Sequence, residues 1–226
     1  MERRHLLGTL AAGTLALGLA PRLTADPAPA PVDPLADFKA RPFALEGGLP
    51  GLSKELMGEH LALYRGYVAR TNALLRDLKA LAAEGRAGAA QEVRRRLGFE
   101  FSGMRLHELY FEALRERGAS PGPAHPLQKA IVAGWGSLEA WWADFKATCT
   151  LPGIGWGALL KDPATGRLLN AWIQDHENAV AVGTVPLLVV DVWEHAYVRD
   201  YGATARAKYV DAIRPLIDWG VVEGRF

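Results

Sequence analysis

The sequence is poor in several features that would assign a class of protein at once. Its single cysteine, Cys149, cannot form an internal disulfide, and no histidine lies near it in sequence to suggest a nucleophile. The formal net charge of +1 provides no basic field for nucleic acid and no acidic field for cationic partners. The apolar run at residues 6–20 is too short, and too rich in Gly and Thr, to span a membrane.

Residues 1–31 are expected to precede the fold rather than to belong to it. The adjacent Arg3 and Arg4, followed by the mildly apolar run, resemble a twin-arginine export signal, and a signal peptidase could cleave after Ala25. The alternating Pro and Ala of residues 26–31 are typical of an extended linker. We therefore expect an exported, periplasmic protein with no stable membrane insertion; an uncleaved anchor at the lipid surface is the alternative.

Helical periodicity dominates the first half of the remaining chain. Half of the residues are hydrophobic, which is enough to bury a sizeable core in one domain or two small ones. Ser53 can cap a helix that ends near residue 83, and a second helix is predicted over 90–117. The loop 118–123, rich in Gly and Pro, is the best domain boundary. Two shorter helices, over 126–134 and 137–148, are predicted beyond it.

The second half changes to extended runs. Residues 154–161 and 168–174 predict a hairpin, a third strand follows at 186–190, and a closing helix is predicted over 204–219. The fold class is therefore α+β. An N-terminal helical hairpin domain is expected over 35–118, followed over 119–226 by a domain with a small, three-stranded antiparallel sheet flanked by helices.

The third strand ends on Asp191, and His195 follows four residues later. A carboxylate at the end of a buried strand is costly unless a cation pairs with it, and a metal ion is the simplest candidate. Imidazole and carboxylate together suit iron, manganese or zinc, whereas calcium and magnesium prefer oxygen ligands throughout. A solvated strand end without any ligand is the alternative.

Two more histidines, His60 and His107, are placed on the core-facing sides of the two long helices. A lone histidine on an apolar face is more often a hydrogen-bonded core residue than a ligand. Three imidazoles and one carboxylate, however, would leave room for a solvent ligand, and open coordination on a redox metal suits small oxygen species.

The segment Asp191–Tyr197, which reads DVWEHAY, resembles the signature of the iron/manganese superoxide dismutases. Supporting similarities extend from about Leu52 to the end of the chain, at Gly136-Ser137, Gly155-Trp156-Gly157, Val185-Pro186-Leu187-Leu188 and Asp218-Trp219. The resemblance implies one iron or manganese ion per chain, with four ligands: His60, His107, Asp191 and His195. It also implies a homodimer or higher homo-oligomer in which Glu194 bonds to the partner subunit's His195, and an aromatic wall formed by Trp156 and Trp193.

The first ligand depends on how the first helix is aligned with the family. Counting forward from Leu52 gives His60, whereas counting back from Tyr67 gives Glu59. We choose His60, because a one-residue bulge in the family helix would let both His60 and Tyr67 keep their places.

The resemblance further implies a side chain that hydrogen-bonds the solvent on the metal. The family's helix position for this group is Gly103 here, whereas the strand position carries His176, within Asp175-His176-Glu177. We therefore expect Tyr67 and His176 to be the catalytic residues that tune the bound solvent. Gln174 is the alternative donor, and a solvated loop position is the alternative for His176.

The implied reaction is the disproportionation of superoxide to dioxygen and hydrogen peroxide. Arg206, offset by one residue from a family arginine, would attract the anionic substrate. One competing class is a non-haem iron oxygenase or oxidase, since two histidines and a carboxylate also describe its ligand set. Another is a metal-binding member of the same fold with altered catalysis.

Overall fold

The computed structural model describes residues 36–118 and 121–226, and residues 37–226 form one compact unit. The expected export signal and linker at 1–31 lie outside the described residues. Among the residues described, no helix combines the length and the hydropathy that a membrane span requires. The boundary expected at residue 118 stays a prediction.

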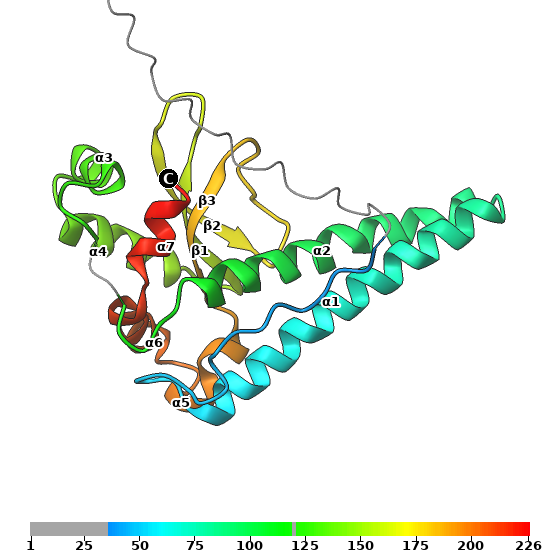
Figure 1. The fold of residues 1–226 in the computed structure, drawn as a ribbon, viewed down its shortest axis with the longest axis horizontal. Helices are drawn as coiled ribbons and strands as arrows, with labels where there is room; N and C mark the ends of the chain where they lie inside the picture. The colour runs from blue at the N-terminus through cyan, green and yellow to red at the C-terminus, as the bar shows by residue number, and fades with distance from the viewer. Residues whose placement is uncertain (1–35, 119–120) are drawn as a thin grey trace, which may run out of the picture. The chain divides into compact units, whose positions relative to one another are not determined.

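Two long helices form an antiparallel hairpin: α1, Lys54–Ala83, and α2, Ala87–Glu112 (Figure 1). Ser53 caps α1 as predicted, because its hydroxyl oxygen accepts a hydrogen bond from the backbone N–H of Leu56 at 3.1 Å. The second helix both begins and ends earlier than the predicted 90–117. It stops at residue 112 because the next residues leave it to pair with the C-terminal part of the chain, where the N–H of Arg115 donates to the carbonyl of Leu216 at 2.9 Å.

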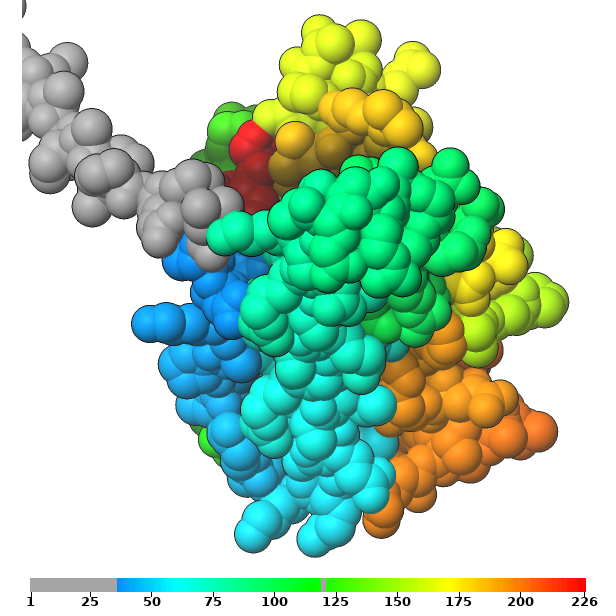
Figure 2. All heavy atoms as spheres, turned by 90° about the vertical axis from the view of Figure 1, so that its right-hand side faces the viewer, coloured from blue at the N-terminus to red at the C-terminus, as the bar shows by residue number. Residues whose placement is uncertain are grey.

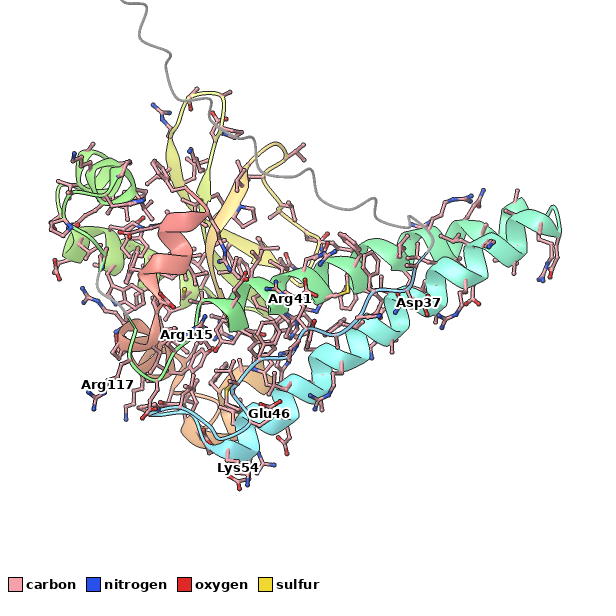
Figure 3. All side chains as sticks on the ribbon, viewed as in Figure 1. Asp37, Arg41, Glu46, Lys54, Arg115 and Arg117 are labelled. Atoms are coloured by element: carbon pink, nitrogen blue, oxygen red, sulfur yellow. The ribbon has the colours of Figure 1, made fainter. Side chains whose placement is uncertain are left out.

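An extended segment, residues 37–52, runs along this hairpin before α1 begins (Figure 3). The backbone N–H of Phe38 donates to the side chain of Asn72, and that of Arg41 donates to the hydroxyl oxygen of Tyr64, both at 2.8 Å. Polar side chains buried on α1 thereby find partners in the segment that precedes it.

Helices α3, Pro126–Trp135, and α4, Leu138–Cys149, lead into the sheet. Its strands are β1, Gly155–Lys161, β2, Leu168–Gln174, and β3, Val185–Asp191, and they pair antiparallel in the order β2-β1-β3. The predicted three-stranded antiparallel sheet is thus confirmed. Strand β3 is buried over its last five residues, so it delivers Asp191 directly into the interior opposite Trp156.

The end of the chain is not one helix over 204–219, as predicted. It contains α5, Val198–Tyr201, α6, Arg206–Ile213, the 3-10 turn η2, Arg214–Leu216, and α7, Trp219–Gly224. Pro215 explains the break, because proline has no N–H to continue a helix and clashes with the preceding turn. Figure 2 shows α1 and α2 side by side, with the chain around α5 against α1.

Candidate metal centre

Four side chains from different parts of the fold converge on one point. His60 comes from α1, His107 from α2, Asp191 from the end of β3 and His195 from the 3-10 turn η1, Glu194–Ala196. One potential ligand atom of each lies within 4.8 Å of the others. The Oδ2 atom of Asp191 is 3.0 Å from Nε2 of His60, 3.1 Å from Nε2 of His195 and 3.6 Å from Nε2 of His107. The structure therefore brings together all four predicted ligands.

The orientation of His107 fits a metal donor. Its Nδ1 atom is 2.6 Å from the carbonyl oxygen of Gly103, and a carbonyl only accepts, so Nδ1 carries the hydrogen. Its Nε2 atom is then unprotonated, fully buried and without a hydrogen-bond partner among the described residues. A second-sphere hydrogen bond that fixes the tautomer in this way is the usual arrangement for a histidine that binds a metal.

Charge in the centre also fits a cation. Burial alone would raise the pKa of Asp191, but His195 and His60 outweigh it and hold that pKa well below its usual range. Burial lowers the pKa of His60, and burial together with nearby His60 lowers that of His107 further, so both imidazoles are neutral. Burial would also lower the pKa of His195, but the Asp191 carboxylate outweighs it and raises that pKa. Three imidazole nitrogens and one carboxylate oxygen are a donor set that suits iron or manganese.

Glu59, the alternative first ligand, points away from the centre. Its side chain is 59% exposed, and its carboxylate accepts a hydrogen bond from Nε of Arg199 at 2.9 Å. Helix α1 is a regular α-helix throughout, with no bulge. His60 and Tyr67 are seven residues apart, close to two turns at about 3.6 residues per turn, so a regular helix already places both on one face.

The two expected tryptophans do form a wall beside the ligands. The ring of Trp156 lies 4.9 Å from that of His107, and the ring of Trp193 stacks on those of His176 and His195 at 4.9 and 5.9 Å. These rings exclude water from one side of the centre, which strengthens electrostatic interactions within it.

His176 is fully buried rather than solvated, and both of its ring nitrogens are occupied. The indole N–H of Trp156 can only donate, so at 3.0 Å it fixes Nδ1 of His176 as the acceptor. Nε2 of the neutral ring then carries the hydrogen and donates to the hydroxyl oxygen of Tyr67 at 2.7 Å. The expected bond from His176 to solvent on the metal thus finds no free nitrogen.

Burial determines the protonation states of His176 and Tyr67. It lowers the pKa of His176 to about 4 and raises that of Tyr67 to about 12, so both groups are neutral near pH 7. A Cβ atom at Gly103 would lie 2.7 Å from Cδ1 of Tyr67 and 3.1 Å from Cδ2 of His176, so a side chain there would displace both. Gln174, the alternative donor, is exposed.

Sequence reasoning missed two tyrosines behind the ligands. The hydroxyl of Tyr209 donates to the backbone carbonyl of Asp191 at 2.8 Å, and Tyr110 bonds to Tyr209 at 2.9 Å. The spacing of three residues between His107 and Tyr110 on one helix was the available signal. Arg206, expected to attract substrate, donates to the backbone carbonyls of Leu151 and Gly153 and so holds the loop between α4 and β1. Its attraction of substrate stays a prediction.

Comparison with known proteins agrees with this geometry. Residues 123–225 match a family model described as iron/manganese superoxide dismutases, C-terminal domain. The chain is 37% identical over 194 residues to the superoxide dismutase [Fe] of Cupriavidus metallidurans, covering 84% of this chain and 96% of that protein. It is 35% identical to the superoxide dismutase [Fe] of Aquifex aeolicus, covering 79% and 85%, and 30% identical to the superoxide dismutase [Mn] 2 of Haloferax volcanii, covering 82% and 92%.

Proposed function

This chain belongs to the iron/manganese superoxide dismutase family, and we propose that it disproportionates superoxide at one iron or manganese ion bound by His60, His107, Asp191 and His195. The observation that carries the proposal is the convergence of these four donors within 4.8 Å, three of them fully buried. A buried carboxylate is costly unless a cation pairs with it, and no organic-substrate pocket is needed to explain the site.

A bound iron or manganese ion would supply the one-electron redox chemistry that the disproportionation of superoxide requires. The protein must then provide protons for the peroxide product. Tyr67 fits this role: His176 donates to its oxygen, so its own hydrogen is free to donate elsewhere. Its pKa of about 12 keeps the phenol protonated at neutral pH. Trp156 holds His176 in the tautomer that makes this possible.

A xanthine-oxidase-coupled assay on metal-loaded protein, with metal content measured on the same sample, tests the function. We expect dismutation that scales with bound iron or manganese. Stoichiometric metal without dismutation would favour an oxygenase or a non-catalytic metal protein instead.

We also propose that the protein is exported as a folded chain to the periplasm. The support is the pair Arg3 and Arg4 ahead of the apolar run at 6–20, since a receptor recognises the paired arginines. Changing both residues to Lys should leave the protein in the cytoplasmic fraction. Undiminished periplasmic protein in that variant would indicate an ordinary secretory signal.

The partner that we propose is a second copy of this chain, docked at the exposed side of His195. The imidazole of His195 is 23% exposed and lies in a surface depression with Leu63, Glu194 and Val198. An exposed carboxylate next to a partly exposed ligand suits the Glu194 to His195 contact across a two-fold axis. Sedimentation of Glu194→Ala should show a shift toward monomer; an unchanged dimer would place the interface elsewhere.

A further inference from the structure

A buried carboxylate on α2 has no part in the centre described above. Glu100 is only 1% exposed, and both of its oxygens accept hydrogen bonds from arginines. Nε of Arg70 on α1 donates to Oε2 at 2.7 Å, and Nε and Nη2 of Arg96 donate to Oε1 at 2.9 and 2.6 Å. The side chains of Arg70 and Arg96 are themselves about half exposed. The buried Glu100 carboxylate therefore holds two arginines that packing alone would leave free to change rotamer.

Each arginine covers an aromatic ring. The guanidinium carbon of Arg70 lies 4.6 Å from the ring centre of Tyr67, and that of Arg96 lies 4.2 Å from the ring centre of Phe99. Both distances are within the range of a cation–π interaction. Glu100 therefore determines where two guanidinium planes rest, and through them it restrains two rings.

These two rings enclose His176. Tyr67 meets its imidazole edge-on, with centres 4.9 Å apart, and Phe99 meets it from another side at 4.6 Å. His176 follows Asp175, a non-glycine residue with a φ of 54°, at the start of an irregular loop. A residue on such a loop needs outside packing to hold one position, because its own backbone does not belong to a helix or strand.

We propose that Glu100 is a positioning residue for dismutation. It holds Arg70 and Arg96 on the rings of Tyr67 and Phe99, and thereby fixes His176 and the Tyr67 hydroxyl against the metal centre. This inference rests on the proposed roles of Tyr67 and His176. Small displacements of positioned groups have large effects on rate, which is why a carboxylate that contacts neither metal nor substrate matters.

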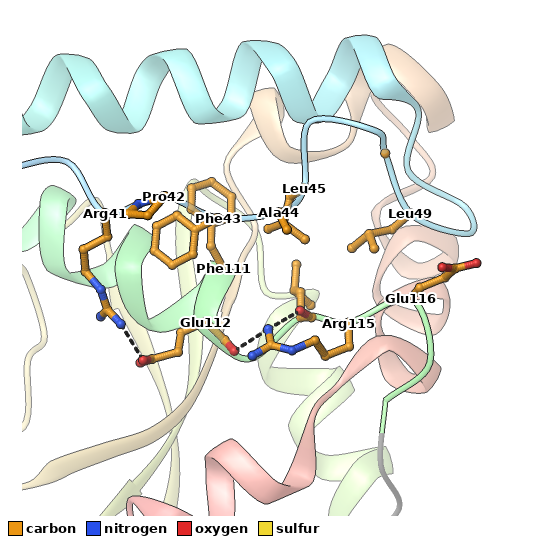
Figure 4. A pocket seen from close by; sticks show the side chains of 12 residues that line it. Arg41, Pro42, Phe43, Ala44, Leu45, Leu49, Phe111, Glu112, Arg115 and Glu116 are labelled. Atoms are coloured by element: carbon orange, nitrogen blue, oxygen red, sulfur yellow. Dashed lines mark hydrogen bonds and ion pairs between the residues drawn. The ribbon is translucent and has the colours of Figure 1, made fainter.

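The chain provides a matched control on the same helix. Glu112 also joins two arginines: Arg41 donates to its Oε1 at 2.6 Å and Arg225 to its Oε2 at 2.9 Å. Figure 4 shows Arg41 reaching Glu112 at the edge of a pocket between residues 41–49 and residues 111–116. The ring that Arg41 covers is Phe43, which packs on Tyr64 and Phe111 instead of His176.

The test compares Glu100→Gln with Glu112→Gln as metal-loaded holoenzymes. Stopped-flow kinetics give kcat and KM separately, the EPR spectrum of the ferric or manganous enzyme reports ligand geometry, and azide titration reports access to the centre. For Glu100→Gln we expect full metal content, a fall in kcat of about tenfold, an altered EPR spectrum and a changed azide dissociation constant. For Glu112→Gln we expect metal content, kcat and the azide dissociation constant within about twofold of the parent values, and an unchanged EPR spectrum.

Equal behaviour of the two variants would overturn the inference, as would a loss of activity in Glu100→Gln that matches its loss of metal. If Glu100→Gln fails to fold, the half-exposed arginines provide the test, since Arg70→Met and Arg96→Met each remove one arm. Each should lower kcat and leave metal content intact; parent-like kcat and EPR spectra in both variants would overturn the inference.

Arg70→Lys retains the charge without the planar guanidinium, so it should resemble Arg70→Met. Parent-like kinetics in Arg70→Lys, with a loss in Arg70→Met, would mean that charge and not position matters.

These outcomes are separate from the proposed function. Absence of dismutation in the metal-loaded parent protein would refute that function whatever Glu100 does. A parent that dismutates superoxide, together with an inert Glu100→Gln substitution, would refute only the positioning role.

Discussion

The two sides of the centre differ in how their polar atoms are satisfied. On the ligand side, Nε2 of His107 has no partner among the described residues, although it is fully buried. On the side of the hydrogen-bonded series, Trp156 donates to His176 and His176 donates to Tyr67, so both ring nitrogens of His176 are occupied. Buried polar atoms are rarely left unpaired, so Nε2 of His107 needs a partner that the described residues do not supply, as a metal ion would, whereas the imidazole of His176 is satisfied by protein groups alone.

The difference teaches which residues should control metal binding and which should control rate. Loss of a ligand leaves a metal site with a missing donor and uncompensated charge. Loss of a residue in the hydrogen-bonded series leaves the metal in place but changes the delivery of protons. The predictions below separate these two effects, beginning with the largest.

Replacing His107 with Ala should abolish both metal binding and dismutation, because it removes one of four donors from a fully buried site. Elemental analysis and the superoxide assay on the same preparation measure it. His125→Ala is the control, because His125 is not one of the four converging side chains. Its imidazole instead caps α3 by accepting a hydrogen bond from the N–H of Leu127. This variant should retain metal while losing about 1 kcal/mol of stability. Stoichiometric iron or manganese in His107→Ala would remove that residue from the site.

The second prediction concerns acid stability on the hydrogen-bonded side. The pKa of His176 is lowered to about 4 in the folded protein, from an ordinary value near 6.5, because the ring is buried. Between these pH values the unfolded chain binds a proton that folded His176 does not. His176 therefore lowers the free energy of unfolding as the pH drops from 6.5 to 4, and has no effect on it above pH 6.5. The shift corresponds to roughly 3 kcal/mol.

His176→Gln lacks this titration, but its amide can still accept from Trp156 and donate to Tyr67. Urea unfolding of both proteins, in the same metal form, should therefore show curves that coincide in slope above pH 6.5 and diverge below it. Parallel curves down to pH 4 would show that folding does not lower the pKa of His176.

Local sequence signals pointed to the four side chains that the structure brings together, and long-range contacts explain what was missed. Asp191 and His195 lie in one short motif, and helical periodicity placed His60 and His107 on the right faces. The early end of α2 depends on pairing with residues a hundred positions later, which no local pattern encodes. Pro215 lies within the predicted closing helix, and the chemistry of proline alone predicts a break there.

The position of His176 was predicted, but its bonding was not. Which nitrogen carries the hydrogen depends on Trp156 and Tyr67, which come from a strand and a helix distant in sequence. The cluster at Glu100 was missed for the same reason, since Arg70 lies on the other helix of the hairpin.

The third prediction sharpens the role of the phenol. Tyr67→Phe should retain metal and lower kcat about tenfold, because it removes the proposed proton donor. It also leaves the N–H of His176 unpaired, at a cost of about 1–3 kcal/mol in stability. Tyr64→Phe is the control on the same helix: its hydroxyl donates to Glu108 at 2.9 Å, so this change should cost stability without lowering kcat. A kcat loss of equal size in both variants would remove the distinction.

The smallest expected effect comes from two glycines of α2, and it tests how tightly the hydrogen-bonded side is packed. In a helix interior, Gly→Ala normally stabilises by about 0.5–1 kcal/mol, because alanine loses less backbone entropy on folding. Gly88→Ala, in the first turn of α2, should show a gain of this sign but smaller size, since a Cβ atom there would meet open space in the described chain. At Gly103 the same methyl group would lie 2.7 Å from the ring of Tyr67, so the ring must move or the helix must shift. Gly103→Ala should therefore forfeit the gain and lower kcat with metal content unchanged, because the ring that must move carries the proposed proton donor. Thermal unfolding and kinetics of the two variants give the comparison. Equal stabilisation by both, with parent-like kcat, would show that Tyr67 has room to move and that its position does not limit the reaction.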